Sequence, residues 1–374
     1  MKTYCFKLYK SKRNKKLHRQ IDTAGRIYNH LIALHKRYYR LYGKHLNIYK
    51  LQKHITKLKK TRRYTNWNSL GSQAIQDITE RIDKGYKLFY RNLKARVRTA
   101  PPSFRKVNKY KSFTLKQAGY QFHEDNTITI MGTRYKYFNS RNMEGVIKRV
   151  TVKRDSLGDI YIYVVCESSP KCIKSGSGKS VGLDFGLTTF ITASDGSTIA
   201  SPLFFAKNLK RTKELNRNRS RKKKGSNHYR KAKLELARHH KRIANQRKDF
   251  HFKLAKSLAG EYAVICIEDL SMKAMQRLWG KKVSDLGFAD FVRTLEHQCS
   301  KTNSKLIKVG RFYPSSKTCS NCGHIYSELS LSERSWICPA CKVHHDRDRN
   351  AAINIHRVGA STLRGGVVRP AAAG

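Results

Sequence analysis

Four of the nine cysteines lie in two C-x2-C pairs near the C-terminal end of the sequence. Cys319 and Cys322 form the first pair, Cys338 and Cys341 the second, and 15 residues separate them, which is within the spacing of structural zinc sites. Gly323 relieves the turn after the first pair. Four thiolates complete a closed tetrahedral site, which is typical of structural rather than catalytic zinc. The spacing therefore predicts one structural Zn²⁺ per chain.

Two carboxylates are set into apolar strands. Asp184 lies in Val181–Leu187, with Gly182 and Gly186 on either side, and we expect these glycines to let a sugar-phosphate backbone approach closely. Glu268 ends the apolar run 263–268. Burying either acid without a partner is costly, so a metal or another cation is expected nearby. A purely structural Asp184, or a Glu268 that only opens the following helix, is the alternative.

A third acid comes from residues 344–355, where a polar cluster runs straight into a helix of small residues. Both Asp346 and Asp348 are candidates. Acids at this position also favour the helix dipole, so an ordinary role at the helix start is the alternative for each.

The elements in the first half of the chain follow from periodicity. Apolar residues at helical spacing predict helices within residues 15–100, one of them through Ile75, Ile78 and Ile82, closed by the pair Pro101-Pro102. Short β segments follow at 112–116, 127–130, 146–153 and 160–166. With a first strand at 3–10, they predict a small β-barrel or sheet domain into which the helices are inserted.

A linker at 174–179 is expected to separate this half from the next. Beyond it the sequence predicts strands at 180–185, 188–193 and 263–268, and a helix at 288–299. Residues 207–249 carry 18 Lys/Arg against 3 Asp/Glu and are thinly apolar, which favours a basic helical hairpin that lies on nucleic acid. The tail 369–374 is expected to be disordered.

The charge balance points to a polyanion. The chain has 79 Lys/Arg and 25 Asp/Glu, a net charge of +54, and residues 11–100 alone hold 24 Lys/Arg and 4 Asp/Glu. Such a charge repels itself unless a polyanion neutralises it. Aromatic residues interleave with these cations and suit base stacking. They are Tyr38, Tyr39, Tyr42, Tyr49, Tyr64 and Trp67. For each of them, half-buried packing within the helices is the alternative.

Two classes of protein are disfavoured. No run approaches the ~18 apolar residues of a membrane span, and residues 1–7 lack the apolar core of a signal peptide.

The remaining cysteines are scattered: Cys5, Cys166, Cys172, Cys266 and Cys299. This distribution favours a metal site in a reducing compartment over a disulfide framework. We expect a soluble, intracellular protein with no membrane partner.

The order of these motifs resembles the TnpB family of transposon-encoded, RNA-guided DNA endonucleases, which are close relatives of compact type V CRISPR nucleases. The resemblance spans essentially the whole chain. It is carried by four segments in order, together with Phe104-Arg105-Lys106: VGLDFGL at 181–187, IEDL at 267–270, YPSSKTCSNCG at 313–323 and DRDRNAA at 346–352.

The resemblance implies a split RuvC nuclease domain with an RNase H-like fold and catalytic carboxylates at Asp184, Glu268 and Asp348. Asp348 is preferred to Asp346 because the family's acid lies two residues before the Asn of Asn-Ala-Ala, and whether Asp346 also binds metal stays open. In-line hydrolysis of a phosphodiester needs an activated water and a stabilised leaving oxygen, and two Mg²⁺ ions ~4 Å apart provide both. Asp184 would bridge the two ions, with Glu268 and Asp348 on either side.

The expected architecture is multidomain α/β. A helical recognition lobe (15–104) is inserted in a small wedge-like β-barrel (1–14 and 105–175), and an RNase H-like RuvC domain (176–318 and 343–374) is interrupted by a zinc ribbon (319–342). The expected activity is Mg²⁺-dependent cleavage of double-stranded target DNA, directed by a bound guide RNA and a short flanking motif. The partners are then guide RNA, target DNA and the RNA–DNA heteroduplex, with one protein chain per ribonucleoprotein.

Two alternatives use the same scaffold. A DNA transposase or strand-transferase would share the fold and the carboxylates. A nuclease-inactive, RNA-guided DNA-binding repressor would lack catalytic acids, and the presence of all three matched acids argues against it.

Overall fold

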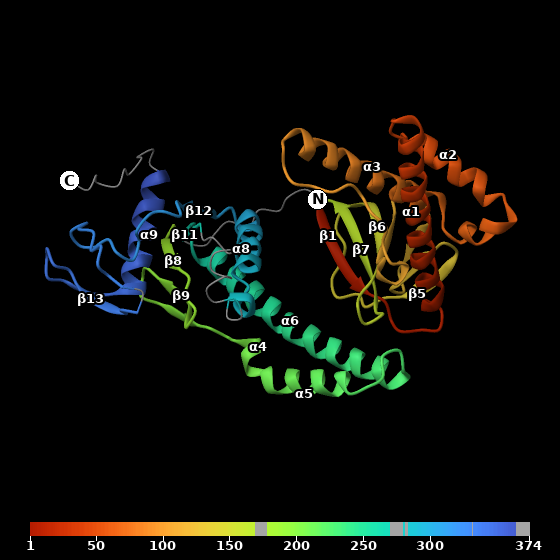
Figure 1. Cartoon of the computed structure of the whole chain (residues 1–374). Coiled ribbons are helices and arrows are strands. Elements are labelled where there is room, and N and C mark those ends of the chain that lie inside the picture. Colours follow the sequence, from red (N-terminus) through yellow and green to blue (C-terminus); the bar gives the residue numbers. More distant parts are fainter. Residues whose placement is uncertain (169–177, 270–279, 281–282, 331, 364–374) are drawn as a thin grey trace. The chain divides into compact units, whose positions relative to one another are not determined.

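The computed structural model describes residues 1–168, 178–269, 280, 283–330 and 332–363. The chain divides into two compact units, Met1–Ser169 and Pro170–Gly374 (Figure 1). The division lies a few residues before the expected linker. Residues 174–177 of that linker, Cys172 and the tail 369–374 lie outside the described residues.

Helices in the first unit lie, along the chain, between its first two strands. The predicted helices occur as α1 and α3, and the residues between them form a further helix, α2, and a 3-10 segment, η1. The bounds are α1 Asn14–Tyr42, α2 Ile48–Lys59, η1 Arg62–Ser69, α3 Ser72–Lys94 and the short η2 Val107–Lys109. The i, i+3/i+4 apolar positions of α1, such as Leu17, Ile21 and Leu31, are fully buried. α1 ends at Gly43, whose left-handed φ of 60° suits a helix C-cap.

Strands of the first unit form two sheets. A four-stranded antiparallel sheet has the order β1-β7-β6-β2, and a separate three-stranded sheet has the order β3-β4-β5. The bounds are β1 Lys2–Lys7, β2 Ser112–Leu115, β3 Tyr120–His123, β4 Thr127–Ile130, β5 Thr133–Lys136, β6 Val146–Arg154 and β7 Ile160–Glu167. Both sheets and the helices share one hydrophobic core.

The expected β-barrel is not closed in the part of the chain that the structure describes. β1 and β2 are the two edges of the four-stranded sheet and do not pair with each other. β3, β4 and β5 pair among themselves, and a single bridge between Leu8 and Tyr137 links the two sets of strands. Two open sheets therefore replace the predicted barrel.

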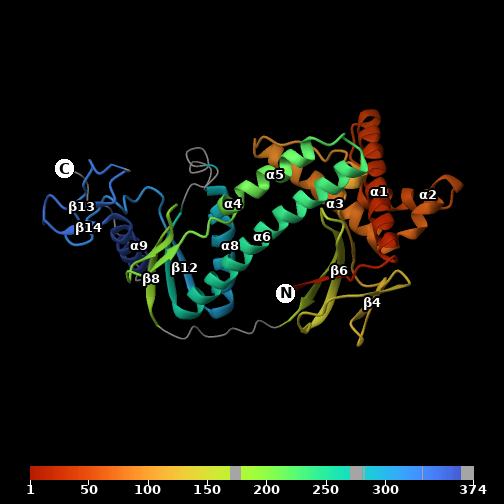
Figure 2. The ribbon, with the colours of Figure 1, turned by 90° about the horizontal axis from the view of Figure 1, so that it is seen from below.

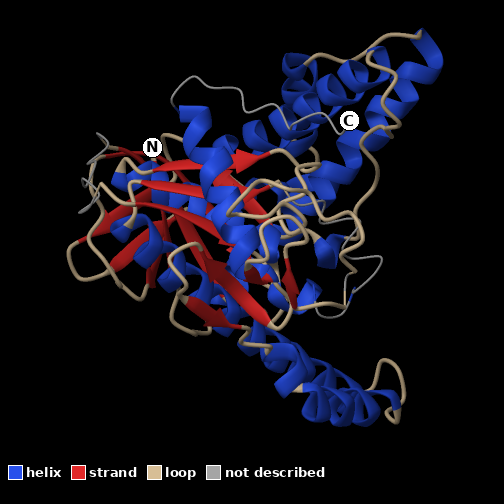
Figure 3. Cartoon of the chain, turned by 90° about the vertical axis from the view of Figure 1, so that its left-hand side faces the viewer, coloured by secondary structure: helices blue, strands red, loops and turns tan. Residues whose placement is uncertain are grey.

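A five-stranded mixed sheet organises the second unit, in the order β10-β9-β8-β11-β12. Figure 3 shows the strands of the chain in red and the helices in blue. β9 pairs antiparallel with β10 and with β8, whereas β11 pairs parallel with β8 and with β12. The bounds are β8 Ser180–Asp184, β9 Thr189–Ala193, β10 Thr198–Ala200, β11 Val264–Glu268 and β12 Lys305–Val309. The tight turn at 194–197 permits antiparallel pairing, whereas the parallel strands need long crossovers that contain the helices.

The basic segment forms the predicted helical hairpin. α5 (Leu209–Ser220) follows the short α4 (Phe204–Lys207) and lies beside α6 (Asn227–Glu261), as Figure 2 shows. The sparse apolar residues Leu215, Leu236 and Ile243 are buried. Ser226 caps α6 by accepting a hydrogen bond from the Tyr229 backbone N–H at 3.1 Å. Most of the cations on this hairpin are left exposed.

Helices cover both faces of the mixed sheet. α8 (Phe288–Thr302) and the end of α6 pack with Val181, Leu183 and Ile265 in one core. α9 (Arg347–Leu363) packs on the opposite face, because Cys266, the strand neighbour of Ile265, lies with Ile355 of α9 in a separate core. A two-stranded sheet, β13 (Ser335–Ile337) and β14 (His344–Asp346), leads into α9. No described helix is long and apolar enough to cross a membrane.

Candidate active site

Asp184 and Glu268 end two neighbouring parallel strands. Asp184 is the last residue of β8 and Glu268 the last residue of β11. The register pairs Leu183 with Ile267, so the residues that follow each of them emerge at the same edge of the sheet. Carboxyl ends of parallel strands are where sheets of this kind place functional groups.

Helix α9 sits directly on these two strands. A Cβ on Gly182 would overlap the carbonyl oxygen of Ala352, and a Cβ on Gly359 would overlap the sulfur of Cys266. The expectation that Gly182 makes room for a sugar-phosphate is therefore wrong, because α9 fills that space. Gly186 likewise accommodates the carbonyl oxygen of Thr189 within its own turn. Gly182 and Gly359 thus allow α9, the helix that carries the third candidate acid, to pack closely on the two strands.

The two acids at the start of α9 have different surroundings. Asp346 is exposed, and its Oδ1 accepts a hydrogen bond from the Arg349 backbone N–H at 2.8 Å, as a helix cap does. Asp348 lies in the first turn of α9, and its Oδ1 is 3.7 Å from Nη1 of Arg334. The cap occupies one oxygen of Asp346, whereas Asp348 is the acid that acts electrostatically on Asp184.

The acids at the sheet edge repel one another. Burial, followed by the charges of Asp348 and Glu268, raises the pKa of Asp184 to about 7, and the charge of Arg347 opposes this only in part. Burial and the charge of Asp269 raise the pKa of Glu268. The fold thus brings Glu268 and Asp348 within electrostatic range of Asp184 and favours a cation that would relieve the repulsion on Asp184.

These carboxylates are hard oxygen donors, which suits Mg²⁺ rather than a thiophilic metal. They do not form a group as compact as the cysteines described next. Among the residues that the structure describes, those cysteines are the only group of three or more His, Cys, Asp or Glu side chains close enough to hold one metal ion. The carboxylate edge is therefore a candidate site for divalent ions on the chemistry and charge of its donors.

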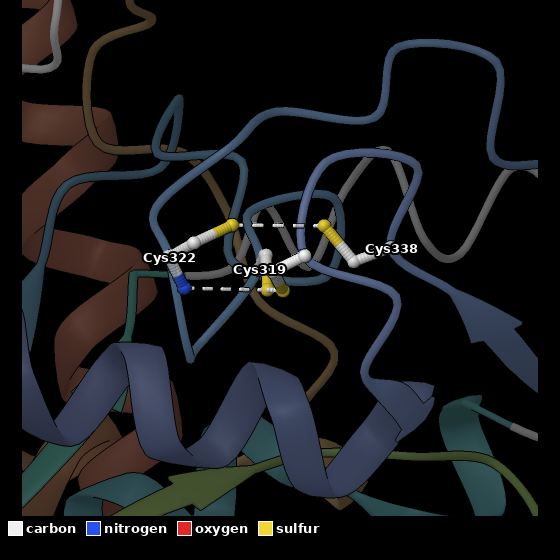
Figure 4. Close-up of side chains that lie close together, drawn as sticks. Cys319, Cys322 and Cys338 are labelled. Atoms are coloured by element: carbon white, nitrogen blue, oxygen red, sulfur yellow. Dashed lines mark hydrogen bonds between the residues drawn. The ribbon is translucent and has the colours of Figure 1, made fainter.

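The four cysteines converge on one point. Their sulfur atoms all lie within 4.8 Å of one another. The sulfurs of Cys319 and Cys341 are 3.6 Å apart, and those of Cys322 and Cys338, joined by a dashed line in Figure 4, are also 3.6 Å apart. A hydrogen bond from the backbone N–H of Val343 lowers the pKa of the Cys341 thiol to about 6, which favours the thiolate that binds metal. Four converging sulfur donors fit a tetrahedral metal site.

Each cysteine pair is held in the same kind of turn. The Gly323 backbone N–H donates to the Cys319 carbonyl at 2.9 Å, and the Lys342 N–H donates to the Cys338 carbonyl at 2.9 Å. Gly323 and Lys342 both have left-handed φ values, 81° and 61°. The expected turn at Gly323 is thus present, and the second pair repeats it with a lysine.

Two asparagines that sequence reasoning did not assign a role connect the cysteine group to α9. Asn350 and Asn354 are almost fully buried. Asn350 accepts a hydrogen bond from the Ser320 N–H at 2.9 Å and donates to the Thr318 carbonyl at 2.8 Å. Asn354 donates to the carbonyls of Thr318 and Ser315 at 2.6 and 2.9 Å. Their i, i+4 spacing in an otherwise small and apolar helix was the available signal.

Two family models and a solved structure match this chain. The family model OrfB_IS605, described as "Probable transposase", matches residues 163–278, and the model Cas12f1-like, TNB domain, matches residues 288–355. A solved Cas12f1–sgRNA–target DNA complex shares the fold, with a TM-score of 0.60 at 14% identity, covering 92% of this chain and 83% of that one.

Curated relatives are more similar in sequence. "Putative RNA-guided DNA endonuclease InsQ" of Escherichia coli K12 is 31% identical over 78% of this chain and 75% of its own length. "Putative RNA-guided DNA endonuclease" of Streptomyces pristinaespiralis is 35% identical over 59% of this chain, and the match spans only 55% of that relative. "TnpB-like protein L79" of Acanthamoeba polyphaga mimivirus is 31% identical over 60% of this chain and 46% of its own length.

Proposed function

The chain belongs to the TnpB family of RNA-guided DNA endonucleases, and we propose that it cleaves double-stranded target DNA under the direction of a bound guide RNA. The single observation that carries the catalytic part is the edge of the mixed sheet, where burial, followed by the charges of Asp348 and Glu268, raises the pKa of Asp184 to about 7. This charge density on hard oxygen donors supports an RNase H-like, RuvC-type domain that depends on Mg²⁺.

In this proposal each acid has a defined position. Asp184 at the end of β8, Glu268 at the end of β11 and Asp348 in the first turn of α9 would together hold the Mg²⁺ ions. Such ions, when bound, activate the attacking water and stabilise the leaving 3′-oxygen. The residues of the chain hold the site in shape: Gly182 and Gly359 seat α9, and β8 and β11 fix the other two acids.

The four cysteines would hold one structural Zn²⁺ and define a zinc ribbon at 319–342. Asn350 and Asn354 tie the segment before this ribbon to α9, so zinc binding would also stabilise the position of Asp348. In this assignment zinc has no part in the reaction itself, because four thiolates leave no open coordination position.

The remaining domains are proposed by the same reasoning. Residues 15–104 form a recognition lobe inserted between segments 1–14 and 105–175, and residues 176–318 and 343–374 form the nuclease domain. Guide RNA, target DNA and their heteroduplex would neutralise the net charge of +54. A single chain would act in each ribonucleoprotein, in the prokaryotic cytoplasm near the nucleoid.

Substitution of the acids tests this proposal. Asp184→Ala, Glu268→Ala and Asp348→Ala should each abolish cleavage and leave binding of guide RNA nearly unchanged, because affinity comes from the cationic surfaces. Asp346→Ala is the matched control. It removes a neighbouring acid that caps α9, which costs about 1 kcal/mol of stability, and should leave cutting intact. Full cutting by Asp348→Ala together with none by Asp346→Ala would identify Asp346 as the third acid instead.

A further inference from the structure

One segment of the first unit carries many basic residues and no acidic ones. Residues 23–76 contain no Asp or Glu and 12 Lys or Arg. Cations without acids of their own are poorly suited to a free surface, since nothing in the segment neutralises them. The same segment holds the tyrosines and the tryptophan that could either pack in the core or stack on bases.

The structure sorts these aromatic residues into two groups. Trp67 is 4% exposed and belongs to the core, and Tyr38 and Tyr64 are half-buried against it. Tyr39, Tyr42 and Tyr49 are instead 55%, 61% and 76% exposed. Packing within the unit therefore accounts for the first group and leaves the second group without a structural role.

The exposed tyrosines lie at one end of the α1–α2 pair. Tyr39 and Tyr42 are in the last turns of α1, Tyr49 is in the first turn of α2, and residues 43–47 join the two helices (Figure 1). Tyr38 contacts Tyr42 with ring centroids 4.7 Å apart, which supports the outer ring from behind. Three large aromatic rings are thus exposed around one helix–helix connection.

Lysines continue from Tyr49 along α2. Lys53 and Lys57 follow it at intervals of four residues, so they lie on the same exposed face, each about 6 Å further along the helix axis. Lys60, just after the helix, extends the row. None of these three lysines forms an ion pair among the residues that the structure describes. The row is free to pair with consecutive phosphates of a strand.

Besides their hydroxyl groups, the exposed tyrosines offer ring faces on which a base can stack. In a duplex the faces of the bases are covered by their stacked neighbours, and only unpaired bases present a face to an aromatic side chain. We propose that the tyrosine–lysine surface, defined as Tyr39, Tyr42, Tyr49, Lys53, Lys57 and Lys60, binds single-stranded nucleic acid. Unpaired bases stack on the tyrosines, and the phosphates contact the lysines. The inference rests on the proposed function only in taking nucleic acid as the partner.

Binding of labelled oligonucleotides to the full chain tests the proposal. The probes are a mixed-sequence single strand, as DNA and as RNA, and the corresponding duplex, followed by fluorescence anisotropy. Tyr42→Ala and Tyr49→Ala should each weaken single-strand binding at least about fivefold and change duplex binding less than twofold. Tyr42→Phe and Tyr49→Phe, the matched controls, keep the ring and should bind within twofold of the wild type.

Salt dependence separates the role of the lysines from that of the rings. Lys53→Ala should lower the slope of log K against log salt by about 0.7 for the single strand, whereas the Tyr→Ala variants should leave the slope unchanged. A larger tyrosine effect on RNA would indicate unpaired guide nucleotides as the ligand. A larger effect on DNA would indicate a displaced DNA strand, and either result supports the proposal.

Three results would overturn the inference. Equal losses of affinity for single strand and duplex in the Tyr→Ala variants would show that the surface contributes only general electrostatic attraction. Unchanged oligonucleotide binding, with a dimer of the wild type that the Tyr→Ala variants dissociate, would make the surface a contact between two copies of the chain. Normal binding by both alanine variants, while Asp184→Ala abolishes cutting, would remove this inference and leave the proposed nuclease standing. A wild type that binds no nucleic acid would remove both.

Discussion

Replacing Asp184 by Asn should stabilise the metal-free protein, and more so at pH 8 than at pH 5. Burial and the charges of Asp348 and Glu268 raise the pKa of Asp184 from its usual 3.8 to about 7. The folded state therefore holds this proton more tightly than the unfolded state does. Stability is lost as the pH rises from about 4 to about 7, because the unfolded carboxyl ionises freely and the folded one ionises only at a cost. Asn has no such proton and escapes the loss.

The size of the effect follows from the two pKa values. The full difference corresponds to at most about 4 kcal/mol. Asp184 is only half-buried by solvent accessibility, so solvent screens part of that energy. The stabilisation by Asp184→Asn should therefore be about 2 kcal/mol larger at pH 8 than at pH 5. Added Mg²⁺ should narrow the difference at pH 8, because the wild-type carboxylates gain a counter-charge that the Asn variant binds less well.

Hydrogen exchange read by mass spectrometry suits this measurement, because it follows peptides from β8 and α9 separately from the other unit. The protein is prepared without Mg²⁺ and without chelators, so that zinc is retained. Asp249→Asn serves as the control, since Asp249 is exposed on α6, where it pairs with Lys253. A stability difference between wild type and Asp184→Asn that is the same at both pH values, or smaller at pH 8, would refute the electrostatic reasoning.

Further predictions concern metal binding and its support. At subsaturating Mg²⁺, cleavage should rise up to about tenfold per pH unit below pH 7 and level off above it, since the proton on Asp184 competes with the metal; a flat profile would count against this competition. Cys338→Ser should remove the bound zinc, measured by elemental analysis, and speed hydrogen exchange at residues 315–320, whereas Cys5→Ser should do neither; full zinc content in Cys338→Ser would disprove the four-cysteine site. Asn354→Ala should cost about 2 kcal/mol of stability and weaken Mg²⁺ binding without loss of zinc, and unchanged Mg²⁺ affinity would show that the clamp does not position Asp348.

Local sequence patterns predicted most elements of this fold. Strands β8 and β9 and helix α8 occur within a few residues of their expected ranges, and α1 starts within one residue of the expected helical region 15–100. Apolar periodicity predicts such elements because it records which side of an element is buried. The hairpin of α5 and α6 was predicted because residues 207–249 are basic and thinly apolar. Of the sparse apolar residues there, Leu215, Leu236 and Ile243 are buried, whereas Leu209 and Leu234 are exposed.

Long-range pairing was not predictable in the same way. Whether strands close into a barrel depends on which edges meet, and no local pattern showed that β3, β4 and β5 pair only with one another. The role of Gly182 was misjudged because its neighbour, Ala352, is 170 residues away in sequence. Asn350 and Asn354 went unassigned for the same reason, since their partners come from a loop that the sequence does not place beside α9.

Guide exchange tests the central claim most directly. The purified protein is loaded with a guide RNA and incubated with Mg²⁺ and plasmid DNA carrying two candidate sites beside the same flanking motif, and the cut ends are sequenced. The account predicts double-strand cutting at the site complementary to the guide, movement of the cut when the guide is changed, and no cutting by Asp184→Ala. Cutting or joining of transposon ends by protein without RNA, at positions that ignore the guide, would contradict it and favour a transposase.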